Sequence, residues 1–195
     1  CLSTQSFHET KNFSCGEGGA LFINKPNYIE RAQIIWEKGT NRSNFLRGEI
    51  NRYTWIDIGS SYLPSDMLAA FLYAQLEVRS QIQSNRKRIW KYYKNSLQEW
   101  AHHQKVQLPY VPKSCEPAYH NFYLILPSQK DRENLISHLK RTNIQASFHY
   151  LPLHLSEMGK RFGGKKKGCP ISKSISDRLI RLPFYSGMVE PDQAR

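Results

Sequence analysis

A lysine lies near the start of the chain in the segment SFHETK, Ser6 to Lys11, and three glycines follow it at positions 16, 18 and 19. A lysine is a nucleophile only where desolvation or a neighbouring cation favours its neutral amine, which then adds to an aldehyde to form a Schiff base. The Ser6 hydroxyl, five residues earlier, is within reach of an anionic group such as a phosphate on the same ligand. Most loop lysines are solvated charges, so these residues alone favour a solvated lysine over a nucleophile.

A second group of candidate residues is the segment FHYLPLH, which contains His149, Tyr150 and His154. Two histidines five positions apart, with no third ligand at a suitable spacing, do not indicate a metal site. Contact with a substrate or with a domain interface fits them better. The four cysteines are widely spaced without a CxxC pair, which argues against a zinc knuckle and a disulfide framework: Cys1, Cys15, Cys115 and Cys169.

The elements that would position the lysine begin with a short apolar run over residues 18–25, which predicts a buried strand. A helix over residues 28–38 follows, with Asn27 as its N-cap and Gly39 as its stop. Residues 40–64 have no sustained period and predict a long loop, and long ordered loops are often functional.

Ser65 is a strong N-cap for a stretch without proline or glycine from residue 66 to about 102. That length exceeds an ordinary globular helix, so we expect two helices or a kink near residues 80–84. The aromatic residues of this stretch have helical spacing, which favours core packing over base stacking: Trp90, Tyr92, Tyr93 and Trp100.

The last third of the chain predicts a strand over residues 120–127, a helix over 128–143 capped by Ser128, and a strand that runs into a loop over 144–154. A strand, helix and strand of this size form a small α/β layer with its own core. The fold class expected is therefore α/β, with a domain boundary within or just after the long helical stretch.

The formal net charge is +12 and the pI is about 9.6, which alone would suggest a polyanion partner. The basic residues are scattered, however, and the only dense run is GGKKKG at 163–168, which predicts a solvated loop. We therefore expect no nucleic-acid partner. There is no apolar run of 18 residues and no leader, so we expect no membrane partner and a cytoplasmic location. Because the sequence opens on Cys1, we expect a piece of a longer polypeptide that lacks an N-terminal half.

Five segments together resemble the DegT/StrS family of sugar-nucleotide aminotransferases, and more closely its dTDP-4-amino-4,6-dideoxygalactose transaminase branch: SFHETKN, GEGGALFIN, IIWEKGTNRSNFLRGEINRYTWIDIGSSYLPSDMLAAFLYAQLE, FHYLPLH and DRLIRLPFY. The resemblance runs from end to end with the motifs in the expected order. It implies the C-terminal part of a fold type I transferase that depends on pyridoxal phosphate. Residues 1–80 would end the cofactor-binding large domain and start the long helix, and 81–195 would form the small α/β domain.

The resemblance also implies roles for individual residues. Lys11 would form the Schiff base with pyridoxal 5′-phosphate and move a proton between Cα and the cofactor, and Ser6 would bind the cofactor phosphate. In a ping-pong reaction, glutamate would donate an amino group to a dTDP-linked 4-keto-6-deoxyhexose. The enzyme would be a homodimer with a site shared between subunits. Lys11 in place of a histidine argues against the dehydratases of the family.

The resemblance further implies phosphate donors from the opposite subunit, on the loop before the long helix. Many members have an Asn in a GxNxR pattern there, whereas this chain has Gly-Ser-Ser-Tyr-Leu at 59–63. Ser60 and Ser61 can still donate hydroxyl hydrogen bonds. Asn41, Arg42 or Arg47 could supply an amide or a cation, and an arginine would bind two phosphate oxygens at once.

The family lines the sugar side of its cleft with the region of His149, Tyr150 and His154. The residues that hold the cofactor ring lie upstream of the lysine in the family, and only ten residues precede Lys11 here. We therefore expect this piece alone to be inactive in transamination. An inactive remnant that only dimerises, and a basic polyanion-binding module, are the alternatives.

Overall fold

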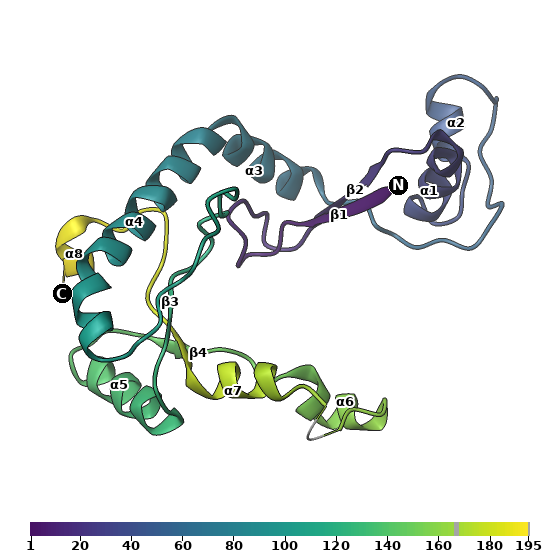
Figure 1. The fold of residues 1–195 in the computed structure, drawn as a ribbon. Helices are drawn as coiled ribbons and strands as arrows, with labels where there is room; N and C mark the ends of the chain where they lie inside the picture. The colour runs from purple at the N-terminus through teal and green to yellow at the C-terminus, as the bar shows by residue number, and fades with distance from the viewer. Residues whose placement is uncertain (166–167, 195) are drawn as a thin grey trace. The chain divides into compact units, whose positions relative to one another are not determined.

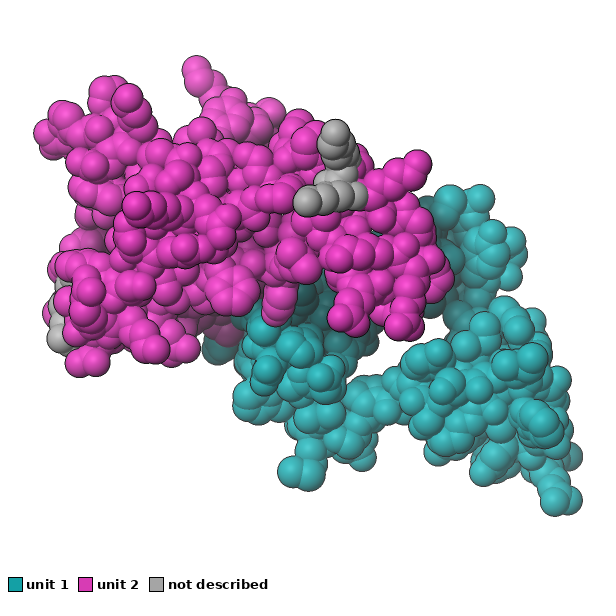
Figure 2. Space-filling model, turned by 90° about the horizontal axis from the view of Figure 1, so that it is seen from below, with its two compact units in different colours: residues 1–79 teal, residues 80–195 magenta. Residues whose placement is uncertain are grey.

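The computed structural model describes residues 1–165 and 168–194, and the chain divides into two compact units, Cys1–Arg79 and Ser80–Arg195 (Figures 1 and 2). The division lies close to the expected boundary between residues 80 and 81. That the two units end a cofactor domain and form a separate small domain stays a prediction. Two lysines of the GGKKKG run, Lys166 and Lys167, lie outside the described residues.

Unit 1 begins with an antiparallel hairpin of β1 (Leu2–Ser6) and β2 (Gly19–Ile23), paired from Leu2↔Ile23 to Ser6↔Gly19. β2 confirms the strand expected in this region, but the expectation that it is buried was wrong, because Leu21 and Phe22 are 50% and 52% exposed. β1 was not expected. The loop between the strands, residues 7–18, carries Lys11. The hairpin therefore fixes both ends of the segment that contains the candidate nucleophile.

The expected first helix is present as a 3₁₀ turn, η1 (Pro26–Tyr28), followed by α1 (Ile29–Trp36). The expectation that Asn27 caps this helix was wrong, because Pro26 starts the 3₁₀ turn and places Asn27 inside it. The helix ends before Gly39, whose φ of +76° is left-handed and whose N–H donates to the Ile34 carbonyl at 2.8 Å. Lys38, with φ of +63°, is the first left-handed residue after the helix, so the predicted stop at Gly39 is correct to within one residue.

The loop over residues 40–64 contains a short helix, α2 (Arg42–Leu46), and is fastened to the end of α1. The Ser60 N–H donates to the Ile35 carbonyl at 2.9 Å, and the Lys38 N–H donates to the Ser60 carbonyl at 3.1 Å. Gly39 and Gly59 pack backbone to backbone, since a Cβ on Gly59 would lie 2.1 Å from the Gly39 nitrogen. The long loop is therefore held by specific backbone contacts.

The long helical stretch consists of α3 (Asp66–Glu77) and α4 (Arg79–His103). Ser65 caps α3 as predicted, and its side chain accepts a hydrogen bond from the Leu68 N–H at 3.3 Å. The break lies at Val78, whose ψ of 18° departs from the helix, so it comes before the expected range of 80–84. Among the described residues no helix has both the length and the hydrophobicity needed to span a membrane.

Unit 2 contains a sheet of β3 (Tyr123–Ile125), β4 (Ser147–Phe148) and β5 (Leu179–Arg181) in the order β3-β5-β4, with β5 antiparallel to both neighbours. The predicted strand, helix and strand correspond to β3, α5 (Gln129–Arg141) and β4. Ser128 caps α5 as expected and accepts from the Asp131 N–H at 3.1 Å. β5 was not expected, and it separates the two predicted strands.

The remaining elements of unit 2 are η2 (Leu153–Leu155), α6 (Glu157–Arg161), α7 (Pro170–Arg178) and α8 (Glu190–Ala194). The core gathers around Phe122, whose ring lies 5.6 Å from that of Trp90 and 5.2 Å from that of Tyr93. Trp90 and Tyr93 are buried, as their spacing predicted. For Trp100 the core prediction was wrong, because 38% of this residue is exposed.

Candidate functional site

The loop that carries Lys11 is closed at its base by backbone hydrogen bonds. The Phe7 N–H donates to the Gly18 carbonyl at 2.8 Å, and the Cys15 N–H donates to the Phe7 carbonyl at 2.9 Å. A third bond of 2.8 Å runs from the Glu9 N–H to the Gly16 carbonyl. These bonds extend the hydrogen-bond ladder of the hairpin into the loop. The two ends of the segment that contains Lys11 are therefore held together.

Lys11 itself lies in a turn in which its N–H donates to the His8 carbonyl at 2.9 Å. The Ser6 hydroxyl accepts from the His8 N–H at 3.3 Å, and the His8 Nδ1 lies 3.1 Å from the Thr10 Oγ1. Ser6 and Lys11 are both exposed. The structure therefore places the two predicted residues on one ordered segment, with an amine and a hydroxyl open to a ligand.

The glycines that follow the lysine serve the packing of this loop. Cys15 is buried, and a Cβ on Gly18 would lie 2.5 Å from its Sγ. The Cys15 Sγ also lies 3.4 Å from the Glu17 carbonyl oxygen. Gly18 is required at this point because any side chain would displace the buried thiol.

A residue on α3 also contacts the loop, although the sequence did not single it out. Gln75 bonds through its side-chain amide to the backbone of Ser14. The signal available in the sequence is the helical spacing of Gln75 with Leu68, Leu72 and Leu76, and the structure shows that these four residues form the half-buried face of α3. A polar residue on such a face needs a partner.

The predicted phosphate ligands Asn41 and Arg42 make structural contacts on the other loop of unit 1. The Asn41 Oδ1 accepts from the Thr54 N–H at 2.8 Å. The Arg42 Nη1 lies 2.8 Å from the Glu37 Oε1, and the Glu37 side chain is only 4% exposed. The partner of Arg42 could not be inferred from spacing, because Glu37 was assigned only to the end of the first helix.

The other predicted phosphate donors on this loop differ in whether their side chains already have a hydrogen-bond partner. Arg47 holds Glu49 through two hydrogen bonds, of 2.7 Å from its Nε and 3.1 Å from its Nη2. This pairing raises the pKa of the Arg47 guanidinium and lowers the pKa of the Glu49 carboxyl. Ser60 and Ser61 are exposed, and their backbone is fixed against α1. Their hydroxyls stand on a rigid segment.

His149, Tyr150 and His154 belong to unit 2, whereas the other predicted site residues belong to unit 1. The His149 and Tyr150 ring centroids are 5.6 Å apart, and the Arg181 guanidinium lies 5.8 Å from the Tyr150 ring. Burial, and then the charge of Arg181, lower the pKa of His149. The His154 Nε2 is buried and has no hydrogen-bond partner among the described residues. The same part of the chain contains no group of three or more His, Cys, Asp or Glu side chains able to bind a metal.

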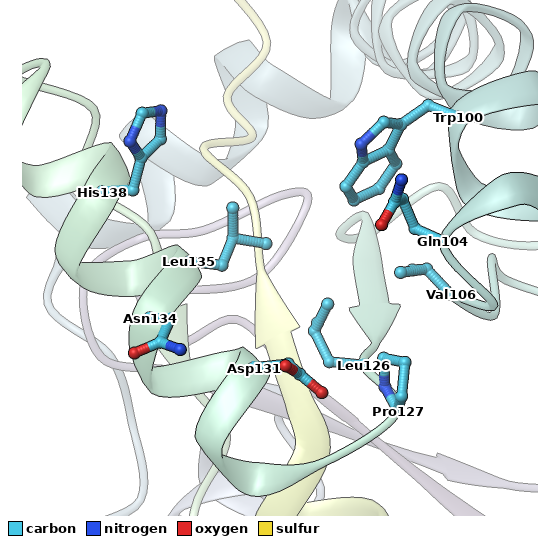
Figure 3. Close-up of a pocket in the computed structure, with 9 residues that line it drawn as sticks. All are labelled: Trp100, Gln104, Val106, Leu126, Pro127, Asp131, Asn134, Leu135 and His138. Carbon is cyan, nitrogen blue, oxygen red and sulfur yellow. The ribbon is translucent and has the colours of Figure 1, made fainter.

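A separate hollow of about 390 Å³ lies in unit 2 between the end of α4, the end of β3 and α5 (Figure 3). Trp100 flanks it from α4 and Gln104 from the turn directly after that helix, and Asp131 and His138 line it from α5. Its position explains why Trp100 is exposed, because the indole forms a wall of this hollow rather than part of the core. It contains none of the predicted site residues.

A lysine on a hairpin loop, a long broken helix and a small α/β unit define part of an aminotransferase fold of the pyridoxal-phosphate type, which confirms the predicted fold class. The structure of S. venezuelae DesV in complex with a ketimine intermediate matches 100% of this chain and 49% of that chain, with a TM-score of 0.85 and 23% identity. The chain belongs to the DegT/DnrJ/EryC1/StrS aminotransferase family, whose model matches residues 1–195.

Two curated relatives are similar over most of the chain. An uncharacterised protein of Methanocaldococcus jannaschii is 29% identical over 194 residues, which are 96% of this chain and 50% of the relative. GDP-perosamine synthase of Escherichia coli O157:H7 is 26% identical over 191 residues, 96% of this chain and 47% of the relative. The chain thus spans about half the length of the curated relatives it matches.

Proposed function

We propose that the chain is the C-terminal part of a sugar-nucleotide aminotransferase and that Lys11 is the amine that bonds to pyridoxal 5′-phosphate. The observation that carries this proposal is the placement of Lys11 on a loop whose base and turn are fixed by backbone hydrogen bonds. The Ser6 hydroxyl lies on the same segment, at the end of β1. Family membership supports the proposal, because the family consists of aminotransferases.

The residues of this loop fit the cofactor chemically. Lys11 offers an exposed primary amine, and Ser6 offers a hydroxyl that can donate to a phosphate oxygen. When bound, pyridoxal phosphate supplies an aldehyde carbon and a conjugated ring that stabilises a carbanion. Lys11 is exposed in this chain, so the desolvation that its neutral amine requires would come from protein outside it.

In the proposed reaction, glutamate gives up its amino group, takes its new keto oxygen from a water molecule and leaves as 2-oxoglutarate. The sugar keto carbon then gains the amino group while its oxygen leaves as water. The Lys11 amine would take the proton from the donor Cα and return it at the acceptor carbon. The Ser6 hydroxyl would hold the phosphate. The proposed acceptor is a 4-keto-6-deoxyhexose linked to dTDP, with His149, Tyr150 and His154 contacting the sugar.

We also propose that the whole protein is a homodimer with a shared site, and the surface of unit 1 supports this. Large apolar side chains are exposed on the loop before α3 and on α3 itself: Trp55 at 75%, Ile58 at 80%, Tyr62 at 64%, Met67 at 83% and Phe71 at 59%. Exposed apolar surface of this kind marks contact with other protein. Ser60 and Ser61 lie within this region, so their hydroxyls would face the cofactor of the second subunit.

The experiment is reductive trapping in the whole protein of which this chain is part. The protein is incubated with pyridoxal phosphate and reduced with borohydride, and its peptides are analysed by mass spectrometry. The pyridoxyl group should appear on Lys11, be lost in Lys11→Ala and be retained in the control Lys25→Ala, which changes an exposed lysine after β2. A label on another side chain, or none, would refute the proposal and favour the inactive remnant or the polyanion-binding module.

A further inference from the structure

Gln75 bonds to both polar groups of one backbone residue in the lysine loop. The Ser14 N–H donates to the Gln75 Oε1 at 3.2 Å, and the Gln75 Nε2 donates to the Ser14 carbonyl at 2.7 Å. The two residues are 61 positions apart in the sequence. A side-chain amide that both accepts from and donates to one residue imitates the pairing of a neighbouring strand, so it fixes the position and the orientation of the backbone it holds.

This contact lies on a face of α3 where a polar side chain would otherwise be unfavourable. Leu68, Leu72 and Leu76 share the half-buried face with Gln75. An amide removed from water without hydrogen-bond partners would destabilise the fold, whereas here both of its ends are satisfied by Ser14. The side-chain amide of Gln75 therefore suits this position, because Ser14 offers both a donor and an acceptor.

The contact acts on the part of the loop that the hairpin bonds do not reach. Those bonds hold the base of the loop through Phe7, Glu9 and Cys15. Lys11 lies between Glu9 and Cys15, in the tip of the loop. Ser14 is on the returning limb, three residues after Lys11. Gln75 therefore anchors the loop on the far side of the lysine, to a helix twelve residues long.

We propose that Gln75 is a positioning residue for Lys11: its amide, through Ser14, holds the loop so that the amine is presented in one place. This inference rests on the proposed role of Lys11. It assigns to α3 a part in the chemistry, although α3 itself contributes no reacting group. Removal of the amide should leave the fold intact and make the lysine loop mobile.

The first test is amide hydrogen exchange on the whole protein without cofactor. Gln75→Met keeps the length of the side chain and removes both hydrogen bonds, and Gln75→Glu keeps only the acceptor. The matched control is Glu77→Met, at an exposed position of the same helix. Loss of two hydrogen bonds should accelerate exchange in peptides covering residues 7–18 by about tenfold or more in Gln75→Met. Peptides from unit 2 and the control variant should stay unchanged.

Loop exchange within twofold of the unmodified chain would overturn the inference. Equal acceleration throughout unit 1 would also overturn it, because Gln75 would then serve the fold and not the loop. If Gln75→Met does not fold, Gln75→Glu gives the same comparison, since it retains a polar side chain and loses the donor to the Ser14 carbonyl.

The second test measures how fast borohydride traps the cofactor on Lys11 in the whole protein at a fixed cofactor concentration. Gln75→Met should slow labelling about tenfold, Gln75→Glu should be intermediate, and Glu77→Met should match the unmodified protein. Equal labelling rates in all variants would overturn the positioning role. If Lys11 is not labelled even in the unmodified protein, the proposed function fails, while hydrogen exchange still decides whether Gln75 holds the loop.

Discussion

Replacement of Gly39 by alanine should open the loop that carries Ser60 and Ser61, and a second glycine offers a matched control. Gly39 and Gly48 have almost the same left-handed backbone, with φ of +76° and +74°. A Cβ on Gly39 would lie 1.8 Å from the Asp57 carbonyl oxygen, whereas a Cβ on Gly48 would have no atom within 4 Å. The two substitutions therefore share the backbone strain and differ only in the collision.

The left-handed conformation should cost either alanine variant about 1–2 kcal/mol. In Gly39→Ala the backbone at Asp57 must also move away. That movement breaks the hydrogen bonds from the Ile56 and Asp57 N–H groups to the Gly39 carbonyl, which are 2.9 and 3.0 Å long. Two such bonds contribute about 1–3 kcal/mol together. We therefore expect a total cost of about 3 kcal/mol for Gly39→Ala and about half of that for Gly48→Ala.

The assay combines urea unfolding with hydrogen exchange of peptides that cover residues 53–62. Gly39→Ala should lower the free energy of unfolding of unit 1 and accelerate exchange in these peptides, because the fastening of the loop to α1 is lost. Gly48→Ala should show the smaller cost and an unchanged loop. Equal costs for the two variants, or a loop that stays protected in Gly39→Ala, would refute the reasoning from steric collision.

Two further predictions concern pH. Burial, and then Tyr185, raise the pKa of Tyr93 to about 12. As pH rises, the unfolded chain therefore loses the Tyr93 proton before the folded chain does, so the free energy of unfolding of unit 2 should fall between about pH 10 and 12. Tyr93→Phe should reduce this fall, measured by urea unfolding at each pH. The same fall in Tyr93→Phe would contradict the role of Tyr93. The pKa of His149 is lowered by burial and then by Arg181, so stability should fall as pH drops below the ordinary value of about 6.5. Arg181→Met should raise the pKa of His149 in an NMR titration. An unchanged pKa would contradict the contribution of Arg181.

Helix boundaries were predictable wherever neighbouring residues decide them. Ser65 and Ser128 cap their helices with their own side chains, through bonds to amides three residues ahead. The first helical segment ends where the backbone is left-handed at Lys38 and Gly39, with φ of +63° and +76°. Each of these signals needs only a few adjacent residues. Asn27 failed as a cap for an equally local reason, since the proline before it starts a 3₁₀ turn.

The strands that escaped prediction are those that depend on distant partners. All five residues of β1 are exposed, so they show no apolar alternation, and β1 is a strand because it pairs with β2. β5 has only three residues, and its partners β3 and β4 are more than thirty residues upstream. Strand pairing of this kind is decided by tertiary packing, which a local pattern does not contain.

The candidate site shows the same difference between features set by neighbouring residues and features set by distant partners. The family resemblance singled out Ser6 and Lys11, and the structure places both at the end of one hairpin. The residues that hold the site segments in place did not follow from the sequence. Gln75 and Glu37 act through partners that the fold brings to them, Ser14 in one case and Arg42 in the other.

These contacts also separate the candidate phosphate donors from one another. Arg42 neutralises a carboxylate that is 4% exposed, and Glu49 binds the Nε and Nη2 of Arg47. A phosphate that recruited Arg42 would leave the Glu37 charge buried without its partner, which is strongly unfavourable. Hydroxyl donation carries no such penalty. For the phosphate site proposed on this loop, the hydroxyls of Ser60 and Ser61 are therefore better donors than Arg42.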